Sequence, residues 1–249
     1  MLKLIKYELR GNLLTILGIC ITVMVANLLL ITRKAAWETD VIIGASICLS
    51  IVAITIIFIS ALNLMSKYLY NDTGYLLFTL PQSGMKIMLS KLLTALIQIT
   101  LVIVVTSLGV CFTLGSPLDF SFFNYITVKG ILVFTFIYIW MTISLLSFIY
   151  FSMVMGKVAL RNKKLGKIGS FIIFILLSVA LFWIESKLTG IFPQTINFDI
   201  SSLFKNSDLI NNNLDSISKI TISNLIFEIL TFAAIFIGTT YMIDNKLDL

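Results

Sequence analysis

The sequence contains no histidine, and this absence excludes several classes of membrane enzyme. Without histidine there is no H-E-x-x-H zinc motif, no Ser–His pair of a rhomboid-type protease and no His-ligated haem. No long apolar run has an aspartate near its middle, which argues against an intramembrane aspartyl protease. The nucleotide-binding pattern G-x-x-x-x-G-K-[ST] is also absent. We therefore expect no catalytic residues, no metal site and no cofactor in this chain.

Charged residues are scarce as well. They make up 12% of the 249 residues, whereas 59% are hydrophobic and the mean hydropathy is +1.05. Soluble proteins have about 25% charged residues, so this composition excludes a soluble enzyme fold. The few cysteines, Cys20, Cys48 and Cys111, lie inside apolar runs at no metal-binding spacing. We expect free thiols there rather than disulfides.

Six long apolar runs divide the chain. Each can cross a bilayer as a helix, since ~20 residues at ~1.5 Å rise span ~30 Å. Backbone polar groups in lipid must be satisfied within the segment, which favours helices. We predict one all-α membrane domain over residues 1–249, with spans at about 13–31, 41–65, 87–114, 126–155, 168–185 and 225–243.

The distribution of charge predicts the orientation of these spans. The net charge is +6, but the cations are spread over the loops and do not indicate a nucleic-acid partner. With the N-terminus inside, the inner segments hold twelve cations and four acids. The outer segments then hold six cations, including Arg33 and Lys34, and eight acids. This bias follows the positive-inside rule, so we expect both termini in the cytosol.

Residues 1–11 combine an apolar stripe with a basic one. The stripes consist of Leu2, Ile5 and Leu9, and of Lys3, Lys6 and Arg10. This pattern predicts an amphipathic helix on the inner leaflet that bends at Gly11 and Asn12. The alternative is that these residues only flank the first span. The apolar run that follows is too long for a signal peptide and has no A-x-A-like cleavage site, so we expect an uncleaved span.

The segment 66–86 (SKYLYNDTGYLLFTLPQSGMK) is expected on the cytosolic side, between the second and third spans. Asn71 or Asp72 can cap a short helix that Pro81 ends. The face of this helix is rich in aromatic and apolar side chains, so something must cover it. The candidates are the other helices of the chain, the lipid headgroups or another protein.

The remaining loops and the polar residues in the spans are less specific. The basic loop 156–167 is expected to contact anionic lipid, at ~1 kcal/mol per cation. The loop 186–224 is either solvated or dips into the outer interface as surface helices. Asn27, Asn63 and Gln98 are expected to form hydrogen bonds between helices. Glu185 and Glu228 are interpreted as interface anchors rather than as carriers of protons.

Residues 71–93 (NDTGYLLFTLPQSGMKIMLSKLL) resemble the membrane subunit of ATP-binding-cassette exporters of the type-2 permease family. Members of that family carry the pattern Y-L-L-x-x-L-P-x-S-x-x-K-I-x-x-S-K after the second span. The matching residues are Tyr75, Leu76, Leu77, Leu80, Pro81, Ser83, Lys86, Ile87, Ser90 and Lys91. Asp72 stands near the acidic position of many members, and Gly84 stands where others have arginine. The layout of six spans with a long loop before the last one is also similar.

The resemblance implies a permease that has no energy source of its own. A separate cytosolic ATPase would hold ATP and Mg²⁺ and grip a coupling helix between spans 2 and 3. The expected contact residues are Asn71, Asp72, Tyr75, Leu76, Phe78, Leu80 and Pro81. The resemblance also implies a second permease copy or a paralogue, a location in a bacterial plasma membrane, and export of amphipathic or antimicrobial peptides, hydrophobic drugs or lipid-like molecules.

Two other functions stay open from the sequence. A non-transporting membrane protein, such as a sensor or an immunity protein, would need no ATPase. A secondary transporter would need a coupling pathway, but no acidic relay crosses the centre of the bilayer. No proline interrupts a span and no repeat aligns the two halves, which also argues against that class.

Overall fold

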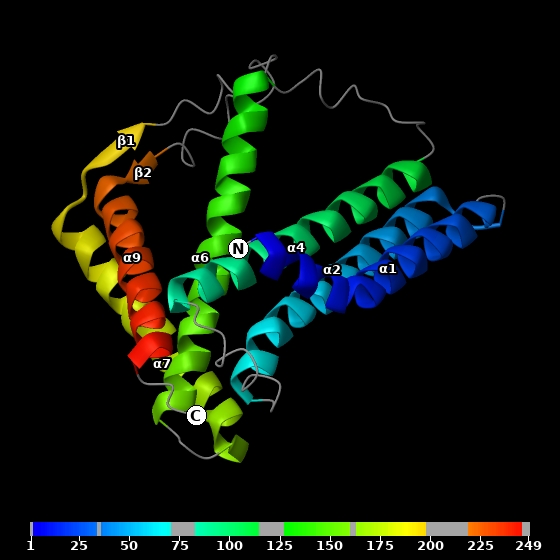
Figure 1. The fold of residues 1–249 in the computed structure, drawn as a ribbon. Helices are drawn as coiled ribbons and strands as arrows, with labels where there is room; N and C mark the ends of the chain where they lie inside the picture. Colours follow the sequence, from blue (N-terminus) through cyan, green and yellow to red (C-terminus); the bar gives the residue numbers. More distant parts are fainter. Residues whose placement is uncertain are drawn as a thin grey trace. The chain divides into compact units, whose positions relative to one another are not determined.

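The computed structural model describes residues 2–33, 36–70, 83–114, 127–159, 163–197 and 219–245. These ranges form six long helices and one pair of short strands (Figure 1). The helices are α1 (Leu2–Thr32), α2 (Thr39–Tyr70), α4 (Gly84–Leu114), α6 (Val128–Ala159), α7 (Lys163–Ile191) and α9 (Ile222–Asn245), and the strands are β1 (Thr195–Asn197) and β2 (Lys219–Thr221). All six helices are long and apolar enough to cross a membrane. The predicted six long apolar helices are therefore confirmed, and they are consistent with an all-α membrane protein.

The helices extend beyond the predicted apolar runs, most clearly at the N-terminus. α1 is continuous from Leu2 to Thr32, so residues 2–11 form the first turns of this helix and are not separated from the first predicted span by a break. A glycine inside a helix costs only about 1 kcal/mol relative to alanine, so Gly11 does not break the backbone hydrogen bonds. α7 likewise continues to Ile191, six residues past Glu185. Hydropathy marks the part of a helix suited to lipid, whereas backbone hydrogen bonding decides where the helix ends.

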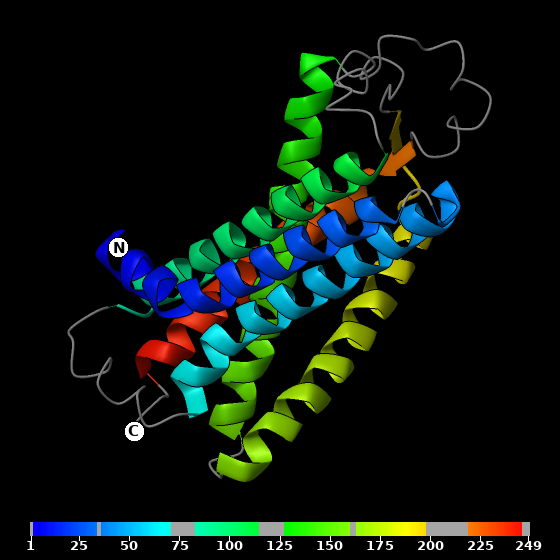
Figure 2. The ribbon, with the colours of Figure 1, turned by 90° about the vertical axis from the view of Figure 1, so that its right-hand side faces the viewer.

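The chain divides into two compact units, Met1–Asp119 and Phe120–Leu249. The first unit contains α1, α2 and α4, and α4 packs against both other helices (Figure 2). α4 buries one face, whose residues recur every three or four positions. These residues are Ile87, Lys91, Ala95, Gln98, Val102 and Thr106.

The three helices of this unit approach closely around Asn27. Its Oδ1 accepts a hydrogen bond of 2.7 Å from the Ser46 hydroxyl of α2, and its Nδ2 donates to the Val23 carbonyl oxygen at 3.0 Å. The expected hydrogen bond between spans is thus confirmed for Asn27. Gln98 differs, because its amide is buried and has no hydrogen-bond partner among the described residues.

Gly109 of α4 is expected to tolerate no larger side chain. A Cβ there would lie 2.5 Å from Asn27 Nδ2, which is held by its own hydrogen bond. Overpacking of this kind costs about 1–3 kcal/mol, so Gly109→Ala should lower the melting temperature of the purified protein in detergent. Gly18→Ala is the matched control, because a Cβ at Gly18 has nothing within 4 Å. Equal melting temperatures for the two variants would contradict the close approach of α1 and α4.

The second unit contains α6, α7, α9 and the strand pair. α6 packs against both other helices. α6 and α7 approach closely at Gly156, where a Cβ would lie 2.7 Å from the backbone nitrogen of Ser170. β1 follows the C-terminal end of α7, and β2 precedes the N-terminal end of α9. The two strands pair antiparallel in the register Thr195↔Thr221, Ile196↔Ile220 and Asn197↔Lys219.

This strand pair lies in the predicted loop 186–224. Residues 188–191, for which a surface segment was one alternative, form the last turn of α7. Ile222 then begins α9, and its backbone N–H donates to the Gln194 carbonyl oxygen at 3.1 Å. A second apolar stretch of this loop, residues 200–204 (ISSLF), lies outside the described residues.

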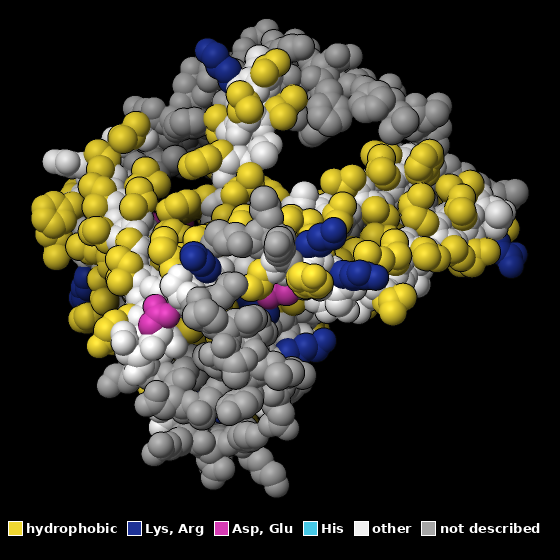
Figure 3. Space-filling view, viewed as in Figure 1, with side chains coloured by type: hydrophobic (Ala, Val, Ile, Leu, Met, Phe, Trp, Pro, Cys, Tyr) yellow, Lys and Arg dark blue, Asp and Glu magenta, His cyan; other side chains and the backbone are white. Residues whose placement is uncertain are grey.

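Large hydrophobic side chains cover the outer faces of the helices (Figure 3). Leu14 of α1 is 84% exposed and Phe182 of α7 is 73% exposed. In water such surfaces would drive association, because contiguous exposed apolar patches are rare on soluble monomers. Helices that are apolar on all sides suit a lipid environment.

Candidate functional site: a buried ion pair beside segment 71–82

The residues that the sequence predicts as contacts for an ATPase lie outside the described residues. They are Asn71, Asp72, Tyr75, Leu76, Phe78, Leu80 and Pro81. The structure does describe the end of α2 before them, at Tyr70, and the second half of the family-like pattern after them, from Ser83 to Lys91.

The second half of the pattern begins α4. The Ser83 carbonyl oxygen accepts hydrogen bonds from the backbone N–H groups of Lys86, at 2.9 Å, and Ile87, at 3.3 Å. The Lys86 side chain is exposed, whereas Ile87, Ser90 and Lys91 are buried. Positions three and four apart lie on one face of a helix, so the pattern K-I-x-x-S-K directs its second lysine into the unit.

Lys91 forms an ion pair with Glu8 of α1. The distance from Lys91 Nζ to Glu8 Oε1 is 2.6 Å, and the side chains are only 7% and 12% exposed. Neither carboxylate oxygen meets a described donor in hydrogen-bond geometry, so the contact is one of charge rather than an aligned hydrogen bond. Lys91 Nζ also lies 5.5 Å from the centre of the Tyr68 ring of α2, within cation–π range.

This cluster joins three helices around one buried cation. Breaking a buried pair by removing one partner costs about 3–5 kcal/mol, because the other charge stays buried without compensation. Tyr68 lies three residues before Asn71, and Lys91 follows Pro81 by ten. The two helices that flank the segment 71–82 therefore meet in one cluster, which also includes Glu8 of α1.

Sequence reasoning missed this cluster because it counted Glu8 and Lys91 among the charges that set the orientation, and Lys91 also as part of the family-like pattern, but did not pair them. Two signals point to it. Lys91 falls inside the predicted span 87–114, where an unpaired cation is costly. Glu8 is the one acidic residue in the basic segment 1–11.

The second unit holds two carboxylates that face neighbouring helices. Trp140 Nε1 of α6 donates a hydrogen bond of 2.8 Å to Glu228 Oε1 of α9. Asn224 Nδ2 of α9 donates one of 3.1 Å to Glu185 Oε1 of α7, and the Thr189 hydroxyl donates to Asn224 Oδ1 at 3.0 Å. Both acids thus connect helices within the unit. The interpretation as interface anchors did not foresee these bonds.

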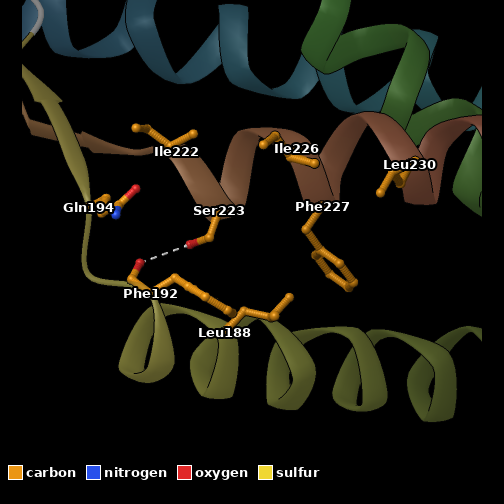
Figure 4. Close-up of a pocket in the computed structure, with 8 residues that line it drawn as sticks. All are labelled: Leu188, Phe192, Gln194, Ile222, Ser223, Ile226, Phe227 and Leu230. Atoms are coloured by element: carbon orange, nitrogen blue, oxygen red, sulfur yellow. Dashed lines mark hydrogen bonds between the residues drawn. The ribbon is translucent and has the colours of Figure 1, made fainter.

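A cavity of about 440 Å³ lies between the ends of α7 and α9 (Figure 4). Leu188 of α7, Phe192 directly after α7, and Phe227 and Leu230 of α9 contribute to its lining, which is mainly apolar. The Ser223 hydroxyl at its edge donates to the Phe192 carbonyl oxygen at 3.3 Å. The described residues that line this cavity include no charged side chain, so they offer shape and apolar surface but little polar recognition.

Comparisons of the chain with protein-family models, curated proteins and solved structures gave no match. The fold by itself defines the class as an all-α, multi-pass membrane protein. Any finer statement of function depends on the residues described above.

Proposed function

We propose that the chain is the permease subunit of an ATP-driven exporter, with a separate cytosolic ATPase bound at residues 71–81. The observation that carries this proposal is the buried cluster of Glu8, Tyr68 and Lys91. This cluster joins α2 and α4, the helices on either side of the segment that resembles the coupling helix of type-2 permeases. A partner that pushed on this segment would act on α1, α2 and α4 together.

The transport step would be a change between two arrangements of the helices. The ATPase would bind ATP and Mg²⁺, and its closure would favour one arrangement through the segment 71–82. The chain itself would need no cofactor. A second copy or a paralogue would complete the path, and the substrates would be amphipathic or antimicrobial peptides, hydrophobic drugs or lipid-like molecules.

The proposed orientation has both termini in the cytosol of a bacterial plasma membrane. In the first unit, the exposed cations Lys6, Arg10, Lys67 and Lys86 belong to the helix ends next to the segment 71–82. Cations concentrate on the cytosolic side of membrane proteins, which supports a cytosolic location for that segment.

Cysteine labelling tests this orientation. In a background with Cys20, Cys48 and Cys111 replaced by alanine, Tyr75→Cys should react with a membrane-impermeant maleimide only after the cells are permeabilised. The control Leu209→Cys, in the loop expected outside, should react in intact cells. Labelling of Tyr75→Cys in intact cells would overturn the assignment, because no cytosolic ATPase could then reach the segment.

Reconstitution tests the energy source. The chain purified alone in liposomes is expected to move no substrate uphill, and the tagged chain purified from its native membrane should retain a nucleotide-binding ATPase. Uphill transport driven by an ion gradient would favour a secondary transporter. If the cellular function of the chain were unchanged after the ATPase gene was removed, a non-transporting protein would be favoured.

A further inference from the structure

Glu228 lies within the membrane-spanning part of α9. It follows Ile222, the first residue of that helix, by six positions, or about 9 Å at ~1.5 Å per residue. A carboxylate at such a depth is costly unless it is paired or faces a cavity. Carboxylates inside spans therefore indicate a functional site by default.

The described contacts of Glu228 do not include an ion pair. Trp140 donates the only N–H of its indole ring to Oε1 at 2.8 Å, which orients the carboxylate. Among the described residues, no lysine or arginine forms an ion pair with Glu228. The indole N–H of Trp140, a neutral donor, therefore positions the Glu228 carboxylate, and the described residues supply no cation to pair with it.

Glu228 lines an open-sided cavity of about 250 Å³ that α6, α7 and α9 form together. Two hydroxyls of the lining are already engaged. Ser144 donates to the Met141 carbonyl oxygen at 3.1 Å, and Thr231 donates to the Glu228 carbonyl oxygen at 2.9 Å. Among the described residues that line the cavity, Glu228 is thus the one charged side chain, and all others except Ser144 and Thr231 are apolar.

Aromatic rings complete the lining. Phe148 of α6 and Phe232 of α9 line the cavity, together with Leu145, Leu181 and Ile235. The ring of Phe232 lies 5.2 Å from that of Trp140, measured between centres. Ring faces attract cations, and a carboxylate beside them adds a full negative charge.

We propose that this cavity binds a small lipophilic ammonium cation, with its nitrogen against Glu228 and its apolar body between Phe148 and Phe232. A hard metal ion would need several oxygen ligands, which one carboxylate does not supply. The volume is below the ~300–1,000 Å³ of sites for drug-sized ligands, which indicates a smaller molecule. The role of this cation as a transported substrate rests on the proposed permease function, whereas its binding does not.

The fluorescence emission of Trp140 can measure this binding directly. The chain has three tryptophans, and the other two, Trp37 and Trp183, are largely exposed. A Trp37→Phe/Trp183→Phe variant of the full chain, in a nonionic detergent, would report the cavity through its one remaining indole. The probe is benzyltrimethylammonium, and the comparison ligand is neopentylbenzene, its neutral isostere.

We expect the ammonium probe to change the emission of Trp140 in a saturable manner and the neutral isostere to bind at least tenfold more weakly. Glu228→Gln should weaken binding of the ammonium probe at least tenfold and leave binding of the isostere unchanged. The amide oxygen of glutamine can still accept the Trp140 hydrogen bond, and the melting temperature checks that the variant folds. Glu185→Gln is the matched control, and it should bind the ammonium as the parent does.

Four results would overturn the proposal. They are no saturable response to the ammonium, equal affinity for the two ligands, unchanged affinity in a folded Glu228→Gln variant, or an equal loss in Glu185→Gln. Equal affinity for the two ligands would indicate an apolar groove for lipid chains. The measurement contains no ATPase, so a negative result leaves the permease proposal standing, and a failure to find an ATPase leaves the cation site standing.

Discussion

Replacing Tyr75 and Leu80 together by aspartate is expected to abolish association of the chain with its ATPase. Truncating one of the few hot-spot residues at the centre of an interface costs about 2 kcal/mol or more, and tyrosine is enriched among such residues. A loss of about 2 kcal/mol corresponds to roughly a 30-fold weaker Kd, and the two unpaired charges add a desolvation cost. Co-purification should therefore fall below detection, and transport should stop.

Two comparisons make this result specific. Leu209→Asp, in the loop expected on the opposite side of the membrane, should leave association unchanged. The melting temperature of the Tyr75→Asp/Leu80→Asp variant should stay near that of the parent protein, because the anchoring residues Tyr68 and Lys91 are intact. ATPase binding that survived in the double variant would contradict the assignment of residues 71–81 as the docking segment.

Lys91→Met should destabilise the first unit more than any exposed substitution. The variant leaves Glu8 buried without a counter-charge, which costs about 3–5 kcal/mol. Glu8→Met should have a similar effect, because it isolates Lys91 instead. The Glu8→Met/Lys91→Met double variant should regain most of the lost stability, since a buried ion pair replaced by apolar side chains is often neutral or favourable. Thermal unfolding of the purified protein in detergent measures all three variants.

Lys86→Met serves as the control for the same helix. Lys86 is exposed and precedes Lys91 by five residues, so its loss should change stability by no more than about 0.5 kcal/mol. If Lys91→Met behaved like Lys86→Met, the ion pair would contribute nothing. If the double variant were as unstable as the sum of the single variants, the two residues would not interact.

The sequence predicted the six spans because hydropathy is a local property of each segment. It also predicted a hydrogen bond between spans at Asn27, since a polar side chain in lipid needs a partner. It did not predict that residues 2–11 continue without a break into the first span, because one glycine does not end a helix whose backbone bonds continue. The helix ends at Tyr70 and Ile191 lie beyond the predicted spans because hydropathy marks only the apolar part of a helix, whereas backbone hydrogen bonding decides where it ends.

The candidate sites required tertiary structure. The spans are apolar on nearly all sides, so their periodicity does not reveal which face meets another helix. Glu8 and Lys91 are 83 positions apart, and Trp140 and Glu228 are 88 apart. Such pairs depend on how the helices pack within each unit.

The amino-acid sequence by itself determined that this chain has six segments long and apolar enough to cross a membrane, because the cost of exposing apolar runs to water is set residue by residue. Only the tertiary structure decided that Lys91 meets Glu8 and Tyr68, and that Glu228 meets Trp140 beside a cavity. The physical reason is that a buried charge is stabilised by the groups around it in space, and those groups come from distant helices.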